Sequence, residues 1–365
     1  MYNWQFKNWP HFSYSKEKLQ EISVAFAQEY GAVNGLMTGL DEELKQETLL
    51  EMLIEEAIKT SEIEGEYMSR EDVMSSIKNN LGIHKNAAVK DKRASGVAKL
   101  MVEINQKTAV PLTLDLLCHW HQILMEHNQK VNPGLWRRGE EPMQIVSGAY
   151  GREVVNYEAP PSAIVPAEME KFIVWYKNPE MPVKDNVSNA LLKSAIAHFH
   201  FESIHPFEDG NGRIGRALAE FALSQTLGAP VLLSLSKTIE KDRKRYYEEL
   251  KTAQRSLEIT EWVNYFSQVI LEAQRDAKEL VQFTLKKAKF FDRYKNQLNE
   301  RQLKVINRML EEGIAGFLGG MTAKKYIAIT KTSKATATRD LQQLNELGVF
   351  TLEGAGRSVR YQLAL

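Results

Sequence analysis

Residues 205–216 read His-Pro-Phe-Glu-Asp-Gly-Asn-Gly-Arg-Ile-Gly-Arg, the densest chemical signal in this chain of 365 residues. The stretch follows one helical pattern that ends near Ser203 and opens another that runs to Leu227. Glycines at positions 210 and 212 let the backbone bend freely and approach a ligand closely. The helix that starts there offers unpaired N–H groups and the positive end of its dipole. The sequence therefore predicts an anion site where the two helices meet.

Four charged or titratable side chains surround this predicted turn. Arg213 and Arg216 are three residues apart and project from one side of the first helical turn. Two guanidiniums suit a polyphosphate better than a single carboxylate. Asp209 adds an oxygen ligand of the kind that holds Mg²⁺ beside phosphates, and His205 can accept a proton from an attacking hydroxyl. The set is neither a Walker P-loop, because Gly-Lys-Ser/Thr is missing, nor a Rossmann fingerprint, because no strand precedes it.

The stretch resembles the motif of the Fic domain, His-x-Phe-x-Asp/Glu-Gly-Asn-Gly-Arg-x-x-Arg, and matches each of its fixed positions. The resemblance covers roughly residues 45–285. Most Fic enzymes transfer AMP from Mg-ATP to the hydroxyl of a Ser, Thr or Tyr side chain in a target protein. The resemblance therefore implies a protein adenylyltransferase with ATP as co-substrate and Mg²⁺ as cofactor.

The resemblance also assigns a role to each motif residue. Phosphoryl transfer of this kind depends on positioning and charge stabilisation, with no covalent intermediate required. The implied roles are the general base His205, the core anchor Phe207, the Mg²⁺ ligand Asp209, the α-phosphate cradle Gly210, Asn211 and Gly212, and the distal-phosphate ligands Arg213 and Arg216.

Two further segments resemble parts of the Fic nucleotide site. Strand signals at 143–147 and 152–156 flank Gly-Ala-Tyr-Gly at 148–151, which is hairpin chemistry. This hairpin resembles the Fic flap, which docks a target segment by strand pairing, and a plain surface hairpin is the alternative. Near residue 250 a second stretch resembles the family segment that lines the adenosine pocket, where an Asn is common and this chain has Gln. The nucleotide contacts expected here are Ile145, Val146, Ser147, Gly148, Tyr246, Tyr247 and Gln254.

A candidate inhibitory segment, Thr-Ser-Glu-Ile-Glu-Gly at 60–65, ends an amphipathic helix. Carboxylates at 62, 64 and 66 crowd the helix C-terminus, where the dipole disfavours negative charge. A solvated acidic helix end is the alternative. The segment resembles the Fic inhibitory motif Ser/Thr-x-x-x-Glu-Gly/Asn, here Thr60, Glu64 and Gly65. The resemblance implies that Glu64 pairs with Arg216 and blocks the γ-phosphate from its productive pose, and that the same Glu in some members helps to remove AMP from a modified target.

The last 65 residues read helix, helix, turn, helix and hairpin, an order that resembles the winged helix. They hold ten Lys/Arg and five Asp/Glu, whereas the whole chain has 47 of each. A basic module therefore joins an acidic body. The residues expected to contact DNA phosphates are Lys334, Thr336, Thr338 and Arg339 on the third helix, with Arg357 and Arg360 in the wing. Protein docking or dimerisation through the same module is the rival interpretation.

The expected fold class is mostly α: a helical Fic fold with a small β-hairpin flap and a C-terminal winged-helix domain. Expected domains are an N-terminal helical region at 1–110 with the inhibitory helix at about 45–65, a catalytic core at 111–290 and the winged helix at 291–365. The aromatic residues between Tyr2 and Tyr14 step by two or three, so we expect an extended arm that packs on the body.

Composition excludes several protein classes. No segment has the roughly 18 consecutive apolar residues of a membrane span, and the N-terminus lacks a signal peptide, so a cytoplasmic protein without membrane contact is expected. The single cysteine, Cys118, excludes a disulfide framework and a multi-cysteine zinc site. The partners expected are an unidentified target protein, the chain itself through autoadenylylation, a second copy in a homodimer, and DNA through residues 301–365. The rival function is a DNA-binding regulator that senses nucleotide without turnover; within the enzyme class, another nucleotide donor is the alternative.

Overall fold

The computed structural model describes residues 1–83, 88–147, 154–179, 185–354 and 358–365. The chain divides into two compact units. The first unit contains Met1–Gly35 and Leu49–Ala277, and the second contains Leu36–Thr48 and Lys278–Leu365. The predicted regions 1–110 and 111–290 thus lie mostly in one unit, and the region 291–365 lies in the other.

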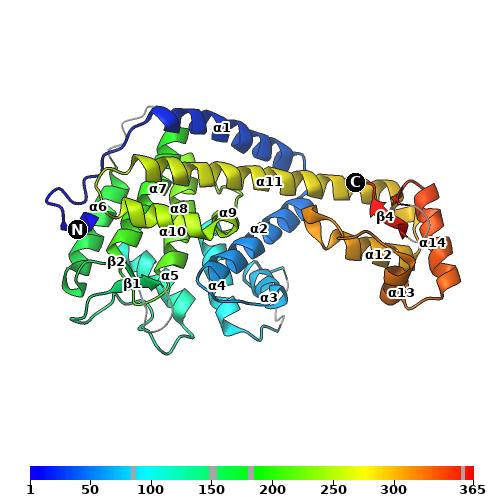
Figure 1. Ribbon diagram of the computed structural model, residues 1–365, viewed down its shortest axis with the longest axis horizontal. Coiled ribbons are helices and arrows are strands. Elements are labelled where there is room, and N and C mark those ends of the chain that lie inside the picture. Colours follow the sequence, from blue (N-terminus) through cyan, green and yellow to red (C-terminus); the bar gives the residue numbers. More distant parts are fainter. Residues whose placement is uncertain (84–87, 148–153, 180–184, 355–357) are drawn as a thin grey trace. The chain divides into compact units, whose positions relative to one another are not determined.

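Helices make up most of the first unit (Figure 1). This agrees with the mostly α fold that the sequence predicts. Within the described residues, no helix has both the length and the apolar content to cross a membrane. The elements that lie wholly in this unit are α3 (Arg70–Asn80), α4 (Lys92–Gln106), α5 (Leu114–Met125), β1 (Gln144–Ser147), β2 (Val154–Glu158), α6 (Val165–Lys177), α7 (Asn186–Ile204), α8 (Asn211–Leu227), α9 (Leu235–Lys241) and α10 (Arg243–Ala253).

Three long helices contribute residues to both units: α1 (Glu17–Thr38), α2 (Glu42–Ile63) and α11 (Thr260–Tyr294). The predicted inhibitory helix at about 45–65 corresponds to α2, which begins three residues earlier and ends two residues earlier. Residues 49–63 of α2, which carry Thr60, belong to the first unit together with α8.

The hairpin α7–turn–α8 occupies the middle of the first unit (Figure 1). Asp185 begins α7 because its carboxylate accepts a hydrogen bond from the Ser188 N–H at 2.7 Å. Gly228 ends α8 with φ 79°, a left-handed conformation that glycine adopts without steric cost. Local capping residues therefore determine where α7 begins and where α8 ends. The conformation of the turn between the two helices depends on tertiary contacts.

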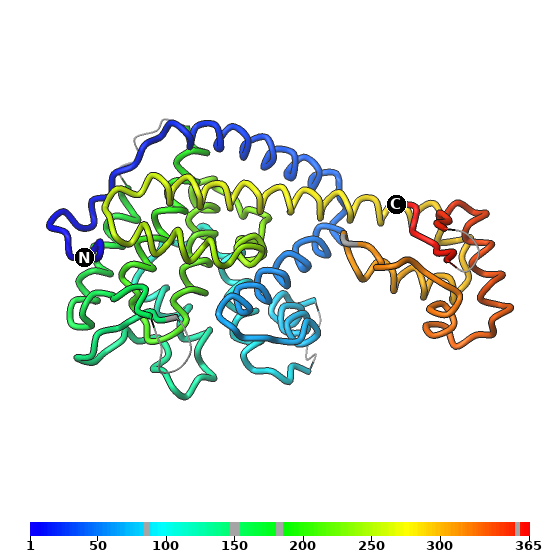
Figure 2. The backbone as a smooth tube through the Cα atoms, in the orientation of Figure 1, coloured from blue at the N-terminus to red at the C-terminus, as the bar shows by residue number. Residues whose placement is uncertain are grey.

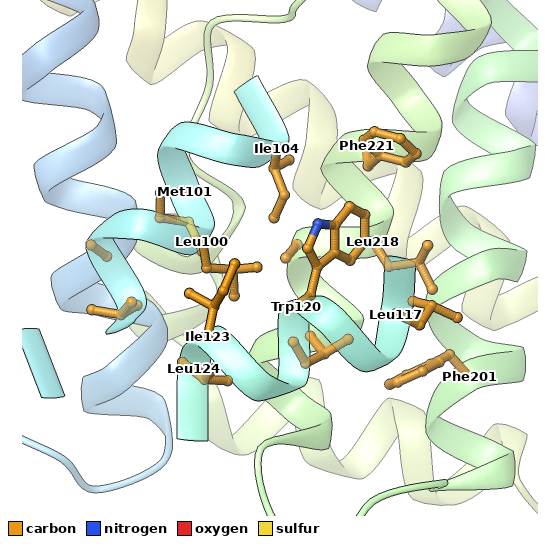
Figure 3. Close-up of a cluster of buried hydrophobic side chains, with 14 of the residues drawn as sticks. Leu100, Met101, Ile104, Leu117, Trp120, Ile123, Leu124, Phe201, Leu218 and Phe221 are labelled. Carbon is orange, nitrogen blue, oxygen red and sulfur yellow. The ribbon is translucent and has the colours of Figure 1, made fainter. Parts of the chain in front are cut away.

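Two apolar cores share α7 and α8. In the first, Trp120 of α5 is fully buried and meets Phe221 of α8 edge to face, with ring centroids 5.0 Å apart (Figure 3). In the second, buried Trp262 of α11 donates its indole N–H to the carbonyl of Ala195 on α7 at 2.9 Å. Full burial of a large apolar side chain contributes about 1.5–3 kcal/mol. Packing from both cores therefore fixes α7 against α8.

The aromatic N-terminal segment lies along the first unit before it enters α1, blue in Figure 2. Apart from one short turn at Asn3–Gln5, it forms no helix. Trp4 donates its indole N–H to the carbonyl of Glu158 in β2 at 2.8 Å, and Trp9 donates to Glu168 of α6 at 2.7 Å. The aromatic residues thus hold an extended arm on the body through both packing and directed hydrogen bonds.

Strands β1 and β2 form an antiparallel pair with a register shift between Ile145 and Val146. The sequence expectation placed the second strand at 152–156, whereas β2 runs from Val154 to Glu158. Its start differs because residues 152 and 153, with the predicted turn at 148–151, lie outside the described residues. Tyr157 of β2 is fully buried, and its side chain anchors the hairpin on the helical body.

The second unit contains α12 (Glu300–Leu310), α13 (Ala323–Thr330), α14 (Lys334–Glu346), β3 (Phe350–Glu353) and β4 (Arg360–Leu363) around its own apolar core. Thr322 and Ser333 cap α13 and α14 by accepting backbone hydrogen bonds, as their sequence positions indicate. β3 and β4 pair antiparallel. The order of elements is the one from which the winged helix was inferred, and that assignment stays a prediction.

A pair of carboxyl groups joins α2 to α8 inside the first unit. Glu56 of α2 is buried and accepts hydrogen bonds from the Ser234 hydroxyl and from the Ser236 N–H, at 2.7 and 2.9 Å. Glu220 of α8 lies beside it; burial first, and then the Glu56 carboxylate, raise the pKa of Glu220 well above its ordinary value. The pair therefore retains a proton at pH values where an exposed glutamate has lost its own.

This shared proton makes stability depend on pH. Above pH 4.3 the unfolded Glu220 is ionised while the folded one still holds its proton, so stability falls as pH rises towards the folded pKa. We expect Glu220→Gln to raise the free energy of unfolding at pH 7.5 by on the order of 1 kcal/mol and to flatten its dependence above pH 5. Thermal unfolding of the full chain between pH 5 and 8 measures both effects. Glu21→Gln on exposed α1 is the matched control, and an unchanged pH slope in Glu220→Gln would contradict the shared proton.

Candidate active site

The turn between α7 and α8 holds His205 in an unusual backbone conformation. His205 ends α7 with φ 50°, in the left-handed region that is rare for residues other than glycine, and its N–H donates to the Phe201 carbonyl at 2.9 Å. Strain of this kind persists only where surrounding contacts fix it, and it is common at functional sites. The imidazole is 17% exposed. The local backbone thus turns this side chain out of the helical stack into a partly open position.

The side chain of Asn211 closes the turn from inside. Its oxygen accepts from the Phe207 N–H at 2.9 Å, and its NH₂ donates to the Phe207 carbonyl at 2.8 Å. Asn211 is also nearly fully buried. Its side-chain amide therefore holds the loop in shape, and the α-phosphate role that the resemblance implies for this position stays a prediction.

Phe207 anchors the same turn in the core. Its ring is fully buried and stacks on the imidazole of His121, with centroids 3.9 Å apart and planes 6° apart. Arg137 binds the turn from the other direction: its Nε donates to the His205 carbonyl at 2.7 Å and its backbone N–H to the Pro206 carbonyl at 2.9 Å. A buried guanidinium and a buried ring thus position residues 205–207 before any ligand arrives.

At the start of α8, a glycine is required by packing as well as by conformation. Gly210 has φ 81°, and a Cβ atom built on it would lie 2.5 Å from the methyl group of Met125. A Cβ built on Gly212 would lie 2.1 Å from a carboxylate oxygen of Glu64. The Glu64 carboxylate therefore lies directly over the N-terminal turn of α8, where the dipole attracts negative charge.

Arg216 binds the end of α2 through three contacts. Its Nη2 lies 2.8 Å from Glu64 Oε1 and donates to the Thr60 carbonyl at 2.8 Å, and its Nε donates to the Thr60 hydroxyl at 2.9 Å. The guanidinium is fully buried, which disfavours its charge, yet the Glu64 carboxylate raises the pKa of Arg216 above its ordinary value. Nη1 of Arg216 has no hydrogen-bond partner among the described residues. One donor of a buried cation is thus left for an anion.

Arg213 has a carboxylate partner from the same segment. Its Nη1 donates to Glu66 at 2.7 Å, and its guanidinium is 4% exposed. The sequence shows the crowding of carboxylates at 62–66 but not their partners, because both arginines come from α8, almost 150 residues later. Glu62, by contrast, pairs with Lys59 one turn back on α2, at 2.6 Å. Each of the three crowded carboxylates therefore faces a cation, and two of those cations are the motif arginines.

Asp209 presents its carboxylate at the edge of the site. The side chain is 50% exposed, and Oδ1 accepts from the Gly210 N–H at 2.6 Å. Oδ2 accepts from the Asn128 amide at 3.4 Å. Among the described residues no cluster of three or more metal-ligating side chains exists. A single exposed carboxylate fits Mg²⁺, which takes one or two protein carboxylates and completes its shell with water and phosphate oxygens.

A cavity of about 650 Å³ opens beside these groups. Its volume lies within the range of small-molecule sites. Of the residues predicted from sequence, nine line it: Glu64, Ile145, Val146, His205, Gly212, Arg216, Tyr246, Tyr247 and Gln254. The other predicted contacts Asp209, Gly210, Asn211 and Arg213 are not among its lining residues; Gly148 and the side chain of Ser147 lie outside the described part of the chain. Thr60 and Gly65 do not line the cavity. Thr60 contacts Arg216 instead, and Gly65 has φ 79° where the chain turns after Glu64.

The N-terminal arm supports the wall of this cavity, a role that the sequence does not reveal. Asn3 is buried; its NH₂ donates to the Ser203 hydroxyl at 2.8 Å, and its N–H donates to the Gln254 carbonyl at 2.8 Å. Tyr157 of β2 donates its hydroxyl to the Ser203 carbonyl at 2.6 Å. These contacts span up to 251 positions along the chain, so no local pattern could have predicted them.

Two family models match the chain. Residues 111–223 match the Fic/DOC family, and residues 2–83 match a domain of unknown function, DUF4172. The matched Fic/DOC range contains the hairpin β1–β2, α7, the turn and most of α8. Residues 111–223 therefore match a Fic/DOC domain, and His205 and the two motif arginines lie within the matched range.

Two curated relatives match parts of this chain at low sequence identity. Over 99 residues the chain is 31% identical to a probable protein adenylyltransferase of Aquifex aeolicus, which covers 27% of each chain. Over 193 residues it is 24% identical to the protein adenylyltransferase Fic of Drosophila erecta, covering 52% of this chain and 35% of the relative. The chain thus spans about a third or less of the length of these two relatives.

Solved structures show the same fold. A Fic family protein from Desulfovibrio desulfuricans G20 superposes with a TM-score of 0.59 over 97% of this chain and 98% of that chain, at 20% identity. A Fic domain containing signaling protein from Bacteroides thetaiotaomicron gives a TM-score of 0.52 over 71% of this chain and 97% of that chain, at 17% identity. The helical architecture is thus that of Fic proteins.

The contacts of Glu64 and Glu66 predict how the site responds to anions. Each carboxylate competes with phosphate oxygens for one motif arginine, and a charge-assisted hydrogen bond contributes about 1.5–3 kcal/mol. We expect Glu64→Gln and Glu66→Gln each to tighten ATP binding about tenfold, as measured by titration calorimetry with Mg²⁺ present. Glu62→Gln, which removes the partner of Lys59 only, is the control. Equal ATP affinity in all four proteins would show that neither carboxylate occupies the phosphate site.

Proposed function

We propose that this protein is a Fic-type transferase that moves AMP from Mg-ATP to the hydroxyl of a Ser, Thr or Tyr side chain in a target protein. One observation carries the proposal: His205, the start of α8 and the buried guanidinium of Arg216 line one cavity of about 650 Å³. The cavity suits a nucleotide whose phosphate is attacked by a hydroxyl. His205 can accept the proton, the start of α8 can bind the phosphate, and Arg216 Nη1 has a hydrogen-bond donor to offer it.

In the proposed reaction the target oxygen forms a bond to the α-phosphorus, and the bond from that phosphorus to the β-bridging oxygen breaks. His205 takes the hydroxyl proton, and pyrophosphate is the leaving group. The backbone N–H groups of Asn211 and Gly212 stabilise the charge on the α-phosphate, since that of Gly210 donates to Asp209, and Arg213 and Arg216 bind the distal phosphates. Because α7 and α8 are fixed by two cores, these groups are positioned before the substrate binds, which is the main contribution that a protein makes to phosphoryl transfer.

Asp209 is the residue that would hold Mg²⁺, since its carboxylate is exposed beside the helix start. The ion would neutralise the phosphate charge. Asn128 and Gly210 donate hydrogen bonds to the Asp209 carboxylate and hold it in place. The other ligands of the ion would be phosphate oxygens and water.

The segment after α2 acts as a brake in this proposal. Glu64 lies over Gly212 and pairs with Arg216, so a γ-phosphate and the Glu64 carboxylate compete for the same guanidinium. Glu66 blocks Arg213 in the same way. A carboxylate so close to the α-phosphate cradle also suits removal of AMP from a modified target, by orienting a water.

Strands β1 and β2 offer a docking edge for the target segment. Each strand has a single neighbour in its sheet within the described residues, and Val146, Val154 and Val155 expose much of their apolar surface. An extended target segment could add to such an edge by main-chain hydrogen bonds. The target is a protein with a flexible hydroxyl-bearing segment, and an exposed segment of a second copy of this chain would serve for autoadenylylation.

The proposed reaction predicts a mass change that depends on two residues. We expect Glu64→Gly protein incubated with Mg-ATP to gain AMP adducts at least about tenfold faster than the wild type, because Arg216 is then free for phosphate. His205→Ala in the same background should abolish the adducts while ATP binding persists. Intact-mass spectrometry reads the adduct, and circular dichroism confirms folding. A folded Glu64→Gly protein that gains no AMP, with or without added lysate, would refute AMP transfer.

A nucleotide-sensing DNA-binding regulator is the second candidate, favoured by the basic surface of α14 and β4. Lys334, Thr338 and Arg339 are exposed on α14, and Arg360 is exposed on β4; Thr336 is only partly exposed, and Arg357 lies outside the described residues. Exposed cations at a helix start and on an adjacent strand can contact DNA phosphates.

This candidate predicts salt-dependent binding to duplex DNA. In a gel shift with the full chain, the affinity should fall with salt, and Lys334→Ala with Arg339→Ala should reduce the slope of log K against log salt by about two. Lys286→Ala with Lys289→Ala on α11, which also removes two exposed positive charges, is the charge-matched control. Absence of any shift at 50 mM salt would exclude DNA binding and favour protein docking by this unit.

A further inference from the structure

Glu202 is a buried carboxylate that the proposed mechanism does not use. It lies one turn before His205 on α7 and is 5% exposed. Its Oε2 is 3.6 Å from His205 Nδ1. The positions 198, 202 and 205 read His-x-x-x-Glu-x-x-His and share one face of the helix, a signal that sequence inspection could have recognised.

The space for this carboxylate depends on Gly215 of α8. A Cβ atom built on Gly215 would lie 2.4 Å from Glu202 Oε1 and 3.1 Å from His198 Nδ1. Position 215, directly before the second motif arginine, is thus occupied by glycine because α8 crosses α7 directly over Glu202. Any side chain at position 215 would displace the carboxylate from its place beside His205.

Glu202 has few partners for a buried charge. Oε1 has no hydrogen-bond partner among the described residues. Burial alone would favour its protonated form, but His205, then His198 and Arg216, hold the pKa of Glu202 below its ordinary value. A buried carboxylate with one weak contact is costly unless that contact serves a purpose.

The other histidines of α7 contrast with His205. His198 Nε2 lies 2.8 Å from the Tyr246 hydroxyl, and His200 is enclosed by aromatic rings, with neither nitrogen bonded among the described residues. Burial lowers the pKa of both imidazoles, so both are neutral at pH 7. His205 is the histidine of this helix that combines partial exposure, a carboxylate at Nδ1 and a place in the cavity.

We propose that Glu202 is a positioning residue for His205: it accepts the Nδ1–H and so leaves Nε2 as the acceptor of the target hydroxyl's proton. When Nε2 takes that proton, both ring nitrogens carry hydrogen and the ring becomes a cation that Glu202 neutralises. The Nδ1 proton stays on the ring throughout. The 3.6 Å separation shortens when substrate binds, as catalytic contacts often do. The same division of roles governs the carboxylate–histidine pairs of other enzymes.

This inference rests on the proposed function, and its test uses two substitutions of similar volume in the Glu64→Gly background. Glu202→Gln keeps an oxygen acceptor without charge, and Glu202→Met removes both. We expect Glu202→Met to lower kcat for AMP transfer about 100-fold with KM for ATP within about twofold, and Glu202→Gln to lower kcat less. Glu168→Gln, which neutralises a buried carboxylate on α6 remote from His205, should leave kcat unchanged.

A second readout does not depend on turnover. ¹⁵N NMR of the imidazole of His205 reports which nitrogen carries the proton. We expect the Nδ1–H tautomer in the parent protein and a mixture, or the Nε2–H tautomer, in Glu202→Met. If AMP transfer occurs but neither kcat nor the tautomer changes in folded Glu202→Met, the positioning role is wrong. If no AMP is transferred by any variant but the tautomer shifts, Glu202 positions His205 and the proposed function is wrong instead.

Discussion

The buried guanidinium of Arg216 constrains the rest of the first unit. A fully buried cation needs several partners, and it finds them in the hydroxyl and carbonyl of Thr60 and the carboxylate of Glu64, all from the end of α2. These bonds set how α2 packs on α8: Glu64 lies over Gly212, Thr60 against Arg216, and, one turn further along, Glu56 beside Glu220. The two helices are therefore antiparallel in one register. The contact between Glu64 and Arg216 is thus part of the packing of the first unit.

This arrangement links stability to activity. At one end of the α2–α8 interface, Arg216 is paired with Glu64. At the other end, Glu220 keeps its proton beside Glu56. A ligand that displaces Glu64 from Arg216 must provide an anion of comparable charge and geometry, because one buried charge cannot be left alone without a cost of several kcal/mol. A polyphosphate meets this condition, and the free Nη1 of Arg216 provides an additional donor for it. In the proposed function, displacement of Glu64 and binding of the nucleotide would therefore be one exchange of anions at one guanidinium.

The reactive end of the site depends on a different set of constraints. His205 leaves the helix in a left-handed conformation that Arg137, Phe207 and Asn211 hold from three sides. The N-terminal arm reaches the same place through the contact between Asn3 and Ser203, so a segment far from the motif in sequence supports the wall of the cavity. Such preorganisation is what phosphoryl transfer requires, because the protein contributes position and charge rather than covalent chemistry.

The sequence alone determined the helical character of the chain, the turn between α7 and α8, and the identity of the motif residues, because helix periodicity, caps and glycine positions are local properties. It also located Glu64 as a candidate partner of Arg216, through resemblance to a family. It did not assign partners to Glu66 and Glu56, did not show that the Asn211 side chain packs inside its own loop, and left Glu202 unnoticed. Only the tertiary structure decided these cases, since the partners of Glu66 and Glu56 come from distant segments and the packing of Asn211 and Glu202 depends on which atoms share one buried space. Burial turns a charge that sequence shows as an ordinary glutamate into a group that must have a specific partner.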